Sequence, residues 1–129
     1  MKWDPAQYEK FKAERSAPFA ELAGLIDFRP GLRIIDLGCG TGELTRALAD
    51  GAPESDTFGI DASEAMLERA NLLARPGLRF AQGRIEDVEG EWDLIFSNAA
   101  LHWVDDHPAL LRRLTDRLAP GGQLAVQVP

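Results

Sequence analysis

The residues best suited to ligand chemistry form a glycine-rich stretch at positions 34–42, with the sequence IIDLGCGTG. An apolar run leads there directly into glycines at alternate positions, Gly38, Gly40 and Gly42, and a helical pattern follows. Glycines let the backbone turn tightly and approach a ligand closely. The N-terminus of the following helix favours negative charge such as a carboxylate. The stretch predicts a ligand-binding loop after a strand, and a purely structural glycine turn is the alternative.

Two acids accompany this loop. Asp36 lies two residues before Gly38, inside the apolar run, where a buried carboxylate needs a compensating partner. Asp61 ends the next apolar run, about 20 residues past the loop, where the dinucleotide-binding pattern expects an acid that binds ribose. A carboxylate can accept hydrogen bonds from both ribose hydroxyls. A simple capping role for Asp61 at the following helix is the alternative.

The glycines also invite comparison with nicotinamide-binding loops. The pattern of nicotinamide-binding loops, G-x-G-x-x-G, would need a glycine at position 43, where Glu43 stands. A nicotinamide-dependent oxidoreductase is therefore disfavoured and is kept only as a distant alternative.

The elements that must position these residues follow from hydrophobic periodicity. Strands are expected at residues 33–37, 57–60, 78–82, 93–97 and 123–128. Two helices are expected at residues 5–14 and 18–28, and a third at 41–50. Two more are expected, one capped by Ser63 with Met66, Leu67, Ala70 and Leu73 on its apolar face, and one from Pro108 with a stripe of Leu110, Leu111, Leu114 and Leu118. A polar loop is expected at 84–91 and a turn at 120–122.

Strands that alternate with helices of about 10–15 residues indicate right-handed βαβ units and a parallel sheet. The sequence therefore predicts an α/β fold, with a mostly parallel sheet of about five strands and helices on both faces. Residues 1–30 are expected to form an N-terminal helical extension. Residues 31–129 are expected to form the core, in one domain overall.

The composition is that of a soluble globular protein, with 45% hydrophobic and 27% charged residues among 129. The formal net charge of −7 argues against an extended nucleic-acid surface, which needs clustered Lys and Arg. The pair Arg112 and Arg113 is expected on a solvated helix face. No apolar run reaches about 18 residues, so no membrane span is predicted. The N-terminus lacks the apolar stretch of a secretory signal, and a cytoplasmic location is expected.

Cys39 is the single cysteine, so no internal disulfide is expected. Cys39 lies far in sequence from the two histidines, His102 and His107, so the three make no zinc template, and no bound metal is predicted. A nucleophilic thiol would need a base nearby, and the sequence indicates none. We expect Cys39 to fill a small slot in the glycine loop.

The Asp-x-Gly-x-Gly-x-Gly pattern at 36–42 resembles motif I of the class I S-adenosylmethionine-dependent methyltransferases. The resemblance implies a Rossmann-like fold, S-adenosylmethionine as cofactor without a metal, and S-adenosylhomocysteine as product. It places Asp36 near the cofactor's ammonium group and Asp61 on the ribose. The other cofactor-binding residues that it implies in this part of the chain are Gly38, Cys39 and Gly40 in the loop, and Ala62 and Met66 beside the adenine. Met66 is equally well placed as a core residue.

The segments after the third and fourth strands complete the implied site. In the family an acid often follows the third strand and meets the adenine amino group, but Arg84 stands at that position here. Ile85 is expected to read the ring through its backbone, and Glu86 is the expected substitute for the acid. After the fourth strand, Asn98 is expected to contact the methionine portion. His102 is a candidate base or substrate donor and Trp103 a candidate pocket wall, with a structural role as the alternative for each.

Residues 3–11, 13–18, 97–103 and 124–129 are similar to segments of the trans-aconitate methyltransferases, although His102 stands where that family usually has glutamine. This resemblance implies that a small substrate carboxylate attacks the methyl carbon of the sulfonium in line and becomes a methyl ester. A carboxylic acid with a pKa of about 4 is already ionised at neutral pH, so no general base is required. Tyr8 and Arg15 are the expected contacts of the substrate, with an exposed helix face as the alternative for Arg15.

The methyltransferase fold that this chain resembles has two further strands after the fifth, with substrate-recognition segments that have no counterpart here. The edge of the fifth strand is therefore expected to be exposed unless something pairs with it, and a homo-oligomer through that edge, a truncated chain and a minimal binding core are the three alternatives. A truncated or minimal cofactor-binding module without turnover is the alternative to an enzyme.

Overall fold

In a computed structural model, which describes residues 19–98 and 107–127, the chain forms a five-stranded parallel sheet with the order β3-β2-β1-β4-β5. Its strands are β1 (Arg33–Leu37), β2 (Asp56–Asp61), β3 (Leu78–Gln82), β4 (Trp92–Asn98) and β5 (Leu118–Gln127). The predicted α/β fold with a parallel sheet is confirmed. The first four strands lie within one residue of their predicted bounds.

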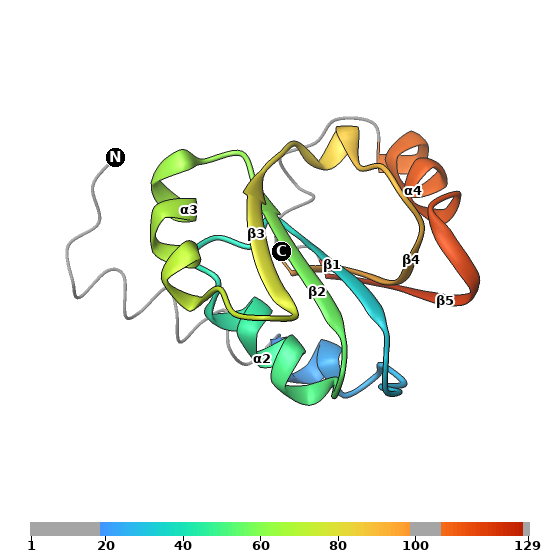
Figure 1. Cartoon of the computed structure of the whole chain (residues 1–129). Coiled ribbons are helices and arrows are strands. Elements are labelled where there is room, and N and C mark those ends of the chain that lie inside the picture. The colour runs from blue at the N-terminus through green and yellow to red at the C-terminus, as the bar shows by residue number, and fades with distance from the viewer. Residues whose placement is uncertain (1–18, 99–106, 128–129) are drawn as a thin grey trace.

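Helices cover both faces of this sheet, as predicted. Helices α2 (Glu43–Gly51) and α3 (Glu64–Ala70) lie on one side, and α4 (His107–Thr115) lies on the other (Figure 1). Two short 3-10 turns, η1 (Asn71–Leu73) and η2 (Ile85–Asp87), follow α3 and β3. Residues 19–23 are also helical and contribute Phe19, which meets Phe96 of β4 edge to face with ring centroids 5.6 Å apart.

The central strand β1 is buried on both faces. Ile34 belongs to the core that includes Leu48 of α2, whereas Ile35 belongs to the core that includes Leu114 of α4. Full burial of an aliphatic side chain stabilises a fold by about 1.5–3 kcal/mol. Because both cores include residues of β1, this strand is anchored from both faces of the sheet.

The prediction for the fifth strand was partly wrong. β5 begins at Leu118, and the expected turn at 120–122 lies inside it as an irregularity between the pairs Trp92–Leu118 and Leu94–Gln123. Gly121, with a φ of 76°, adopts the left-handed conformation that lets the extra residues bulge out. Turn-forming residues look alike in a turn and in a bulge that a neighbouring strand holds, so local pattern could not separate the two.

Two helix predictions also need correction. In the predicted stripe of the last helix, Leu110 and Leu114 are buried but Leu111 is exposed, and Leu118 lies in β5 because the helix ends at Thr115. The helix expected at 18–28 is helical only over residues 19–23 in its described part. It ends at Ala23, and i to i+3 hydrogen bonds then close a tight turn, such as Leu25 N–H to the Leu22 carbonyl. The helix expected at 5–14 lies outside the described residues.

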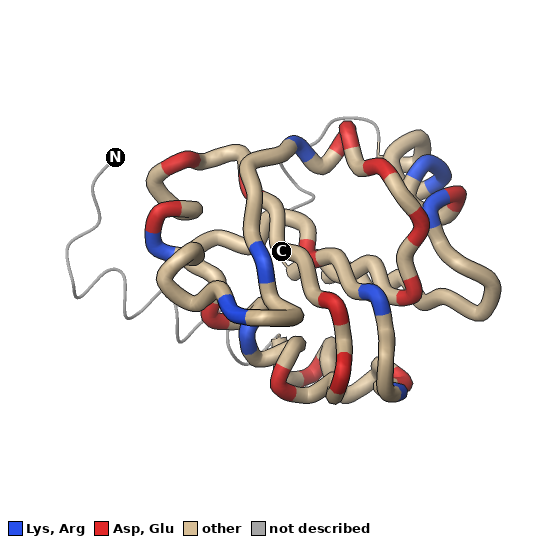
Figure 2. Tube along the Cα trace, viewed as in Figure 1, with Lys and Arg blue, Asp and Glu red and all other residues tan. Residues whose placement is uncertain are grey.

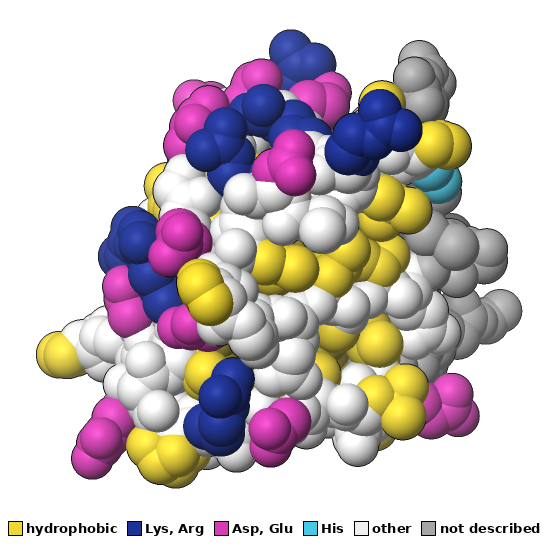
Figure 3. All heavy atoms as spheres, turned by 90° about the vertical axis from the view of Figure 1, so that its right-hand side faces the viewer, with side chains coloured by type: hydrophobic (Ala, Val, Ile, Leu, Met, Phe, Trp, Pro, Cys, Tyr) yellow, Lys and Arg dark blue, Asp and Glu magenta, His cyan; other side chains and the backbone are white. Residues whose placement is uncertain are grey.

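The described surface mixes both signs of charge. Lys and Arg positions are interspersed among Asp and Glu positions along the trace (Figure 2). Arg112 is exposed as predicted, but Arg113 is half-buried and engaged in hydrogen bonds. On the side that carries α4 and β5, hydrophobic side chains gather in a band (Figure 3), and β5 is an edge strand among the described residues. None of the described helices is long and apolar enough to cross a membrane.

Candidate functional site

The predicted site segments lie at the carboxyl ends of four parallel strands. Parallel strands end at one edge of a sheet, so the loops that follow β1, β2, β3 and β4 share that edge. The strand order reverses between β1 and β4, and in open α/β sheets such a reversal marks the crevice where ligands bind. Ser97 Oγ, fully buried near the end of β4, donates to the Leu37 carbonyl at 3.3 Å and joins the two strands there.

The glycine loop folds back onto the end of β2. Its three glycines have φ angles of 77° (Gly38), 58° (Gly40) and 88° (Gly42), a conformation that side-chain-bearing residues rarely adopt. The N–H groups of Gly38 and Cys39 both donate to the Ile60 carbonyl at 2.9 Å. The backbone of this loop therefore favours glycine at those three positions.

Asp61 holds the loop from β2. Its Oδ2 accepts a hydrogen bond from Gly40 N–H at 2.9 Å, and its Oδ1 accepts one from Ser63 N–H at 2.9 Å. Ser63 in turn caps α3 by accepting a hydrogen bond from Met66 N–H at 3.3 Å. An ionised carboxylate offers about four lone-pair sites, so the two backbone bonds leave it able to accept from hydroxyls. The capping alternative is thus part of the observed structure and does not exclude a ligand role.

Asp36 lies on the α2 side of β1. Its side chain is 4% exposed, and its Oδ2 accepts a hydrogen bond of 2.7 Å from Thr45 Oγ1 in the first turns of α2. Thr45 is fully buried. The buried acid was predicted from the sequence but its partner was not, although Thr45 lies at helical spacing from the apolar Leu48.

A phenylalanine from β3 packs behind the loop. A Cβ placed on Gly59 would come within 2.8 Å of Phe80 Cδ1 and 2.9 Å of Cys39 Cβ, and one on Gly42 would come within 3.0 Å of Phe80 Cζ. Cys39 is buried in the same cluster as Phe80. Sequence reasoning missed Gly59 and Phe80, because their importance comes from contact between strands that are distant in sequence.

The segment after β3 is held on both sides. Gln82 Nε2 donates to the Ala62 carbonyl at 3.0 Å, which ties the ends of β2 and β3. Arg84 and Glu86 form an ion pair of 2.7 Å. The hydrogen bond from Arg84 lowers the pKa of the Glu86 carboxyl from 4.5, and the same bond raises the pKa of Arg84. At neutral pH the Glu86 carboxyl is therefore ionised, and it is paired with Arg84 at this edge of the sheet.

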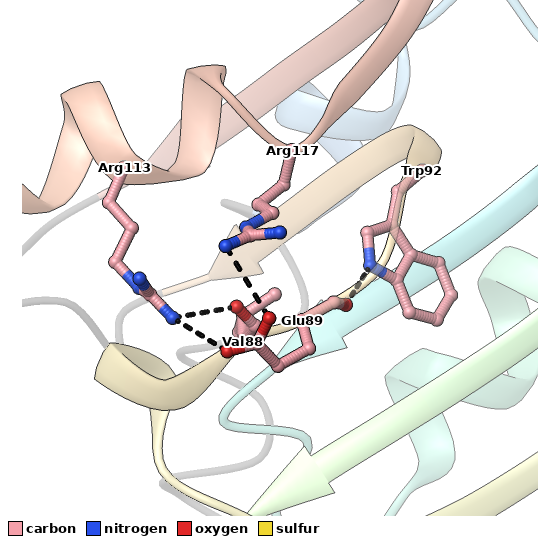
Figure 4. A network of polar contacts seen from close by, with 5 residues as sticks. All are labelled: Val88, Glu89, Trp92, Arg113 and Arg117. Atoms are coloured by element: carbon pink, nitrogen blue, oxygen red, sulfur yellow. Dashed lines mark hydrogen bonds and ion pairs between the residues drawn. The ribbon is translucent and has the colours of Figure 1, made fainter.

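A cluster of polar contacts, here called the Glu89 clasp, fixes the next residues (Figure 4). The Arg113 guanidinium donates to the Val88 carbonyl at 3.0 Å and to Glu89 Oε1 at 3.3 Å, and Arg117 pairs with Glu89 Oε2 at 3.4 Å. Trp92 Nε1 donates to the Glu89 carbonyl at 2.8 Å. The clasp thus connects α4 and the residue before β5 to the segment that carries Ile85 and Glu86.

The remaining predicted residues divide into two groups. Asn98 is buried at the end of β4, Met66 is half-buried on α3 and Ala62 is exposed. The second group lies outside the described residues and consists of Tyr8, Arg15, His102 and Trp103. Among residues 19–98 and 107–127, no three His, Cys, Asp or Glu side chains are grouped so as to hold a metal ion.

Comparison with known proteins identifies the family of this chain. A protein family described as a methyltransferase domain matches residues 34–122, from β1 to the bulge of β5. The chain belongs to this family. The resemblance drawn from motif I is therefore confirmed at the level of the family.

Individual relatives cover the whole chain. The chain is 53% identical over 129 residues to the trans-aconitate 2-methyltransferase of Deinococcus radiodurans, and the match covers 100% of this chain and 50% of that protein. It is 45% identical to the protein of the same name from Acidovorax ebreus, covering 98% of itself and 50% of that relative. The chain spans about half the length of the curated relatives that it matches.

Among solved structures, the chain is similar to an S-adenosylmethionine dependent methyltransferase from Mesorhizobium loti. The two are 33% identical with a TM-score of 0.74, and the match covers 84% of this chain and 51% of the other. The predicted Rossmann-like methyltransferase fold is confirmed by this likeness.

Proposed function

We propose that this chain binds S-adenosylmethionine at the carboxyl edge of its sheet and takes part in methyl transfer to the carboxylate of a small acid such as trans-aconitate. The observation that carries the proposal is the glycine loop held by Asp61, in which Gly40 N–H meets the carboxylate at 2.9 Å. The loop brings bare backbone to the edge, and Asp61 keeps acceptor capacity for ribose hydroxyls. The curated relatives named trans-aconitate 2-methyltransferase support the choice of substrate class.

The residues of this chain fit such a cofactor in the following way. Gly38, Cys39 and Gly40 offer close approach to its methionine portion, and Asp36 supplies negative charge for its ammonium group. Asp61 accepts from the ribose. The cofactor, when bound, supplies a methyl group on a positively charged sulfur, which a carboxylate oxygen can accept without a general base because it is already ionised at neutral pH.

The adenine side of the proposed site involves residues after β2 and β3. Ala62, just before the N-cap of α3, and Met66 within α3 would flank the ring, and the Ile85 backbone would read its edge. Glu86 would accept from the amino group while it remains paired with Arg84, since an ionised carboxylate has acceptor sites for both. Asn98 at the end of β4 would meet the methionine portion.

The substrate side remains a prediction from sequence. Tyr8, Arg15, His102 and Trp103 are proposed near the substrate, with residues 31–129 as the cofactor-binding core and residues 1–30 as the extension. A homo-oligomer through the β5 edge and a cytoplasmic location also stay predictions. Catalysis would come mainly from positioning of the two reactants and from exclusion of water.

The proposal is tested by calorimetric titration of the chain with S-adenosylhomocysteine, and with NAD as the control ligand. Saturable binding of S-adenosylhomocysteine without binding of NAD is expected. A folded chain that binds neither, or that binds only NAD, would contradict the proposal.

A cofactor-binding module without turnover is the second candidate that the sequence left open. Transfer of a radiolabelled methyl group from S-adenosylmethionine to trans-aconitate separates the two. A chain that binds the cofactor but transfers no label is a binding module.

A further inference from the structure

We propose that Thr45 is a positioning residue, whose hydroxyl fixes the Asp36 carboxylate toward the ammonium group of the cofactor. This inference rests on the proposed function. Thr45 Oγ1 donates its single proton to Asp36 Oδ2 at 2.7 Å, a normal length for a hydroxyl hydrogen bond. Thr45 is fully buried and Asp36 is 4% exposed, so water does not compete for this bond.

The place of Thr45 in α2 argues for a polar role. Threonine is a poorer helix former than alanine or leucine, and a fully buried position would suit an aliphatic side chain. In a helix its hydroxyl commonly bonds to a carbonyl of the preceding turn. Here the proton goes to Asp36 instead, nine residues back on β1. The bond therefore serves the carboxylate rather than the helix.

The hydroxyl also limits how Asp36 can turn. A β-branched side chain in a helix has few χ1 rotamers, so Thr45 presents its hydroxyl from a nearly fixed point. The Thr45 hydroxyl holds one oxygen of the Asp36 carboxylate. Because the carboxylate is planar, this contact also orients its second oxygen. Only ligands with a positive group near Asp36 should sense this orientation.

The experiment compares two ligands by calorimetry on the 129-residue chain. S-adenosylhomocysteine carries the ammonium group, whereas 5′-methylthioadenosine has the same adenosine and sulfur without the amino acid part. Thr45→Val removes the hydroxyl at almost constant shape, and we expect about a tenfold loss of affinity for S-adenosylhomocysteine, since hydrogen bonds to charged groups are stronger than neutral ones. The affinity for 5′-methylthioadenosine should change by less than about twofold, since it has no group for Asp36.

Two further variants make the test specific. Thr45→Ser keeps the hydroxyl and should keep the native ratio of the two affinities. Thr57→Val is the matched control, because Thr57 is also fully buried but bonds Ser55 Oγ at 2.8 Å at the other end of β2. It should lower stability without changing the ratio. On an Asp36→Asn background, Thr45→Val should cause no additional loss of S-adenosylhomocysteine affinity.

An equal loss for both ligands in Thr45→Val, or native affinity for both, would overturn the positioning role while leaving the proposed function intact. If Thr45→Val does not fold, Thr45→Ala, which also removes the hydroxyl, is measured by the same criterion. A native chain that binds neither ligand overturns the proposed function and this inference together.

Discussion

The backbone N–H of Gly40 donates a 2.9 Å hydrogen bond to the carboxylate of Asp61, so the end of β2 holds the loop that follows β1. The same carboxylate also accepts from Ser63 N–H at the start of α3. A single acid thus organises two strands and a helix where the ligand is proposed to bind. This dual duty means that its structural and ligand-binding roles must be separated by experiment.

Asp61→Ala removes both hydrogen bonds and the proposed ribose acceptor. We expect a loss of about 1–3 kcal/mol in the free energy of unfolding, from two backbone donors that lose their partner. S-adenosylhomocysteine affinity should fall at least about tenfold, as the loss of a charged acceptor implies. Urea unfolding and calorimetry measure the two effects.

Asp56→Ala is the control for Asp61, because Asp56 starts the same strand and is exposed in an ion pair with Arg79 at 3.6 Å. Its replacement should leave ligand affinity unchanged. An Asp61→Ala variant that retains native affinity would refute the ribose role.

Gly59→Ala tests the packing behind the loop. Its Cβ would meet Phe80 Cδ1 at 2.8 Å and Cys39 Cβ at 2.9 Å, so side chains in a dense core must move. Overpacking of this kind costs about 1–3 kcal/mol, and we expect the midpoint of thermal unfolding to fall accordingly.

Gly51→Ala provides the comparison. Nothing lies within 4 Å of a Cβ at that position, which is the last residue of α2. Alanine there should be neutral or stabilising by up to about 1 kcal/mol, since it is the better helix former. Equal stability of the two variants would show that the contact with Phe80 is not tight.

Much of this arrangement was predictable from the sequence, because β1 to β4 are short apolar runs between turn residues. The loop and Asp61 were recognisable from local spacing alone. The contacts made by Thr45, Phe80 and Arg113 were not, since they join elements that only the folded sheet brings together. The start of β5 was missed because pairing with Trp92 overrides the turn tendency of its glycines.

The Arg84–Glu86 pair predicts a specific pH dependence. Its hydrogen bond lowers the pKa of Glu86 from 4.5, so the pair's contribution is fully present above about pH 4.5 and is lost as the pH falls through the lowered value. Arg84→Ala should raise the Glu86 pKa toward 4.5, as measured by NMR titration of the side-chain carboxyl. Both side chains are largely exposed, so stability should change little.

Arg75→Ala is the control for this titration, because Arg75 forms its ion pair with Asp50 of α2 and not with Glu86. It should leave the Glu86 pKa unchanged. If Arg84→Ala also leaves it unchanged, the ion pair does not persist in solution.

Because of the Glu89 clasp, we expect α4 to stabilise residues 85–88, which include the proposed adenine contacts. Arg113→Ala removes the donor to the Val88 carbonyl, and we expect faster amide hydrogen exchange over residues 85–88. The loss of stability should be at most about 1 kcal/mol, because the arginine is partly exposed.

Arg112→Ala, on the exposed face of the same helix, is the control and should leave exchange at the native rate. Equal exchange over 85–88 in the two variants would mean that packing of Val88 against Leu110 and Leu114, rather than the clasp, holds this segment.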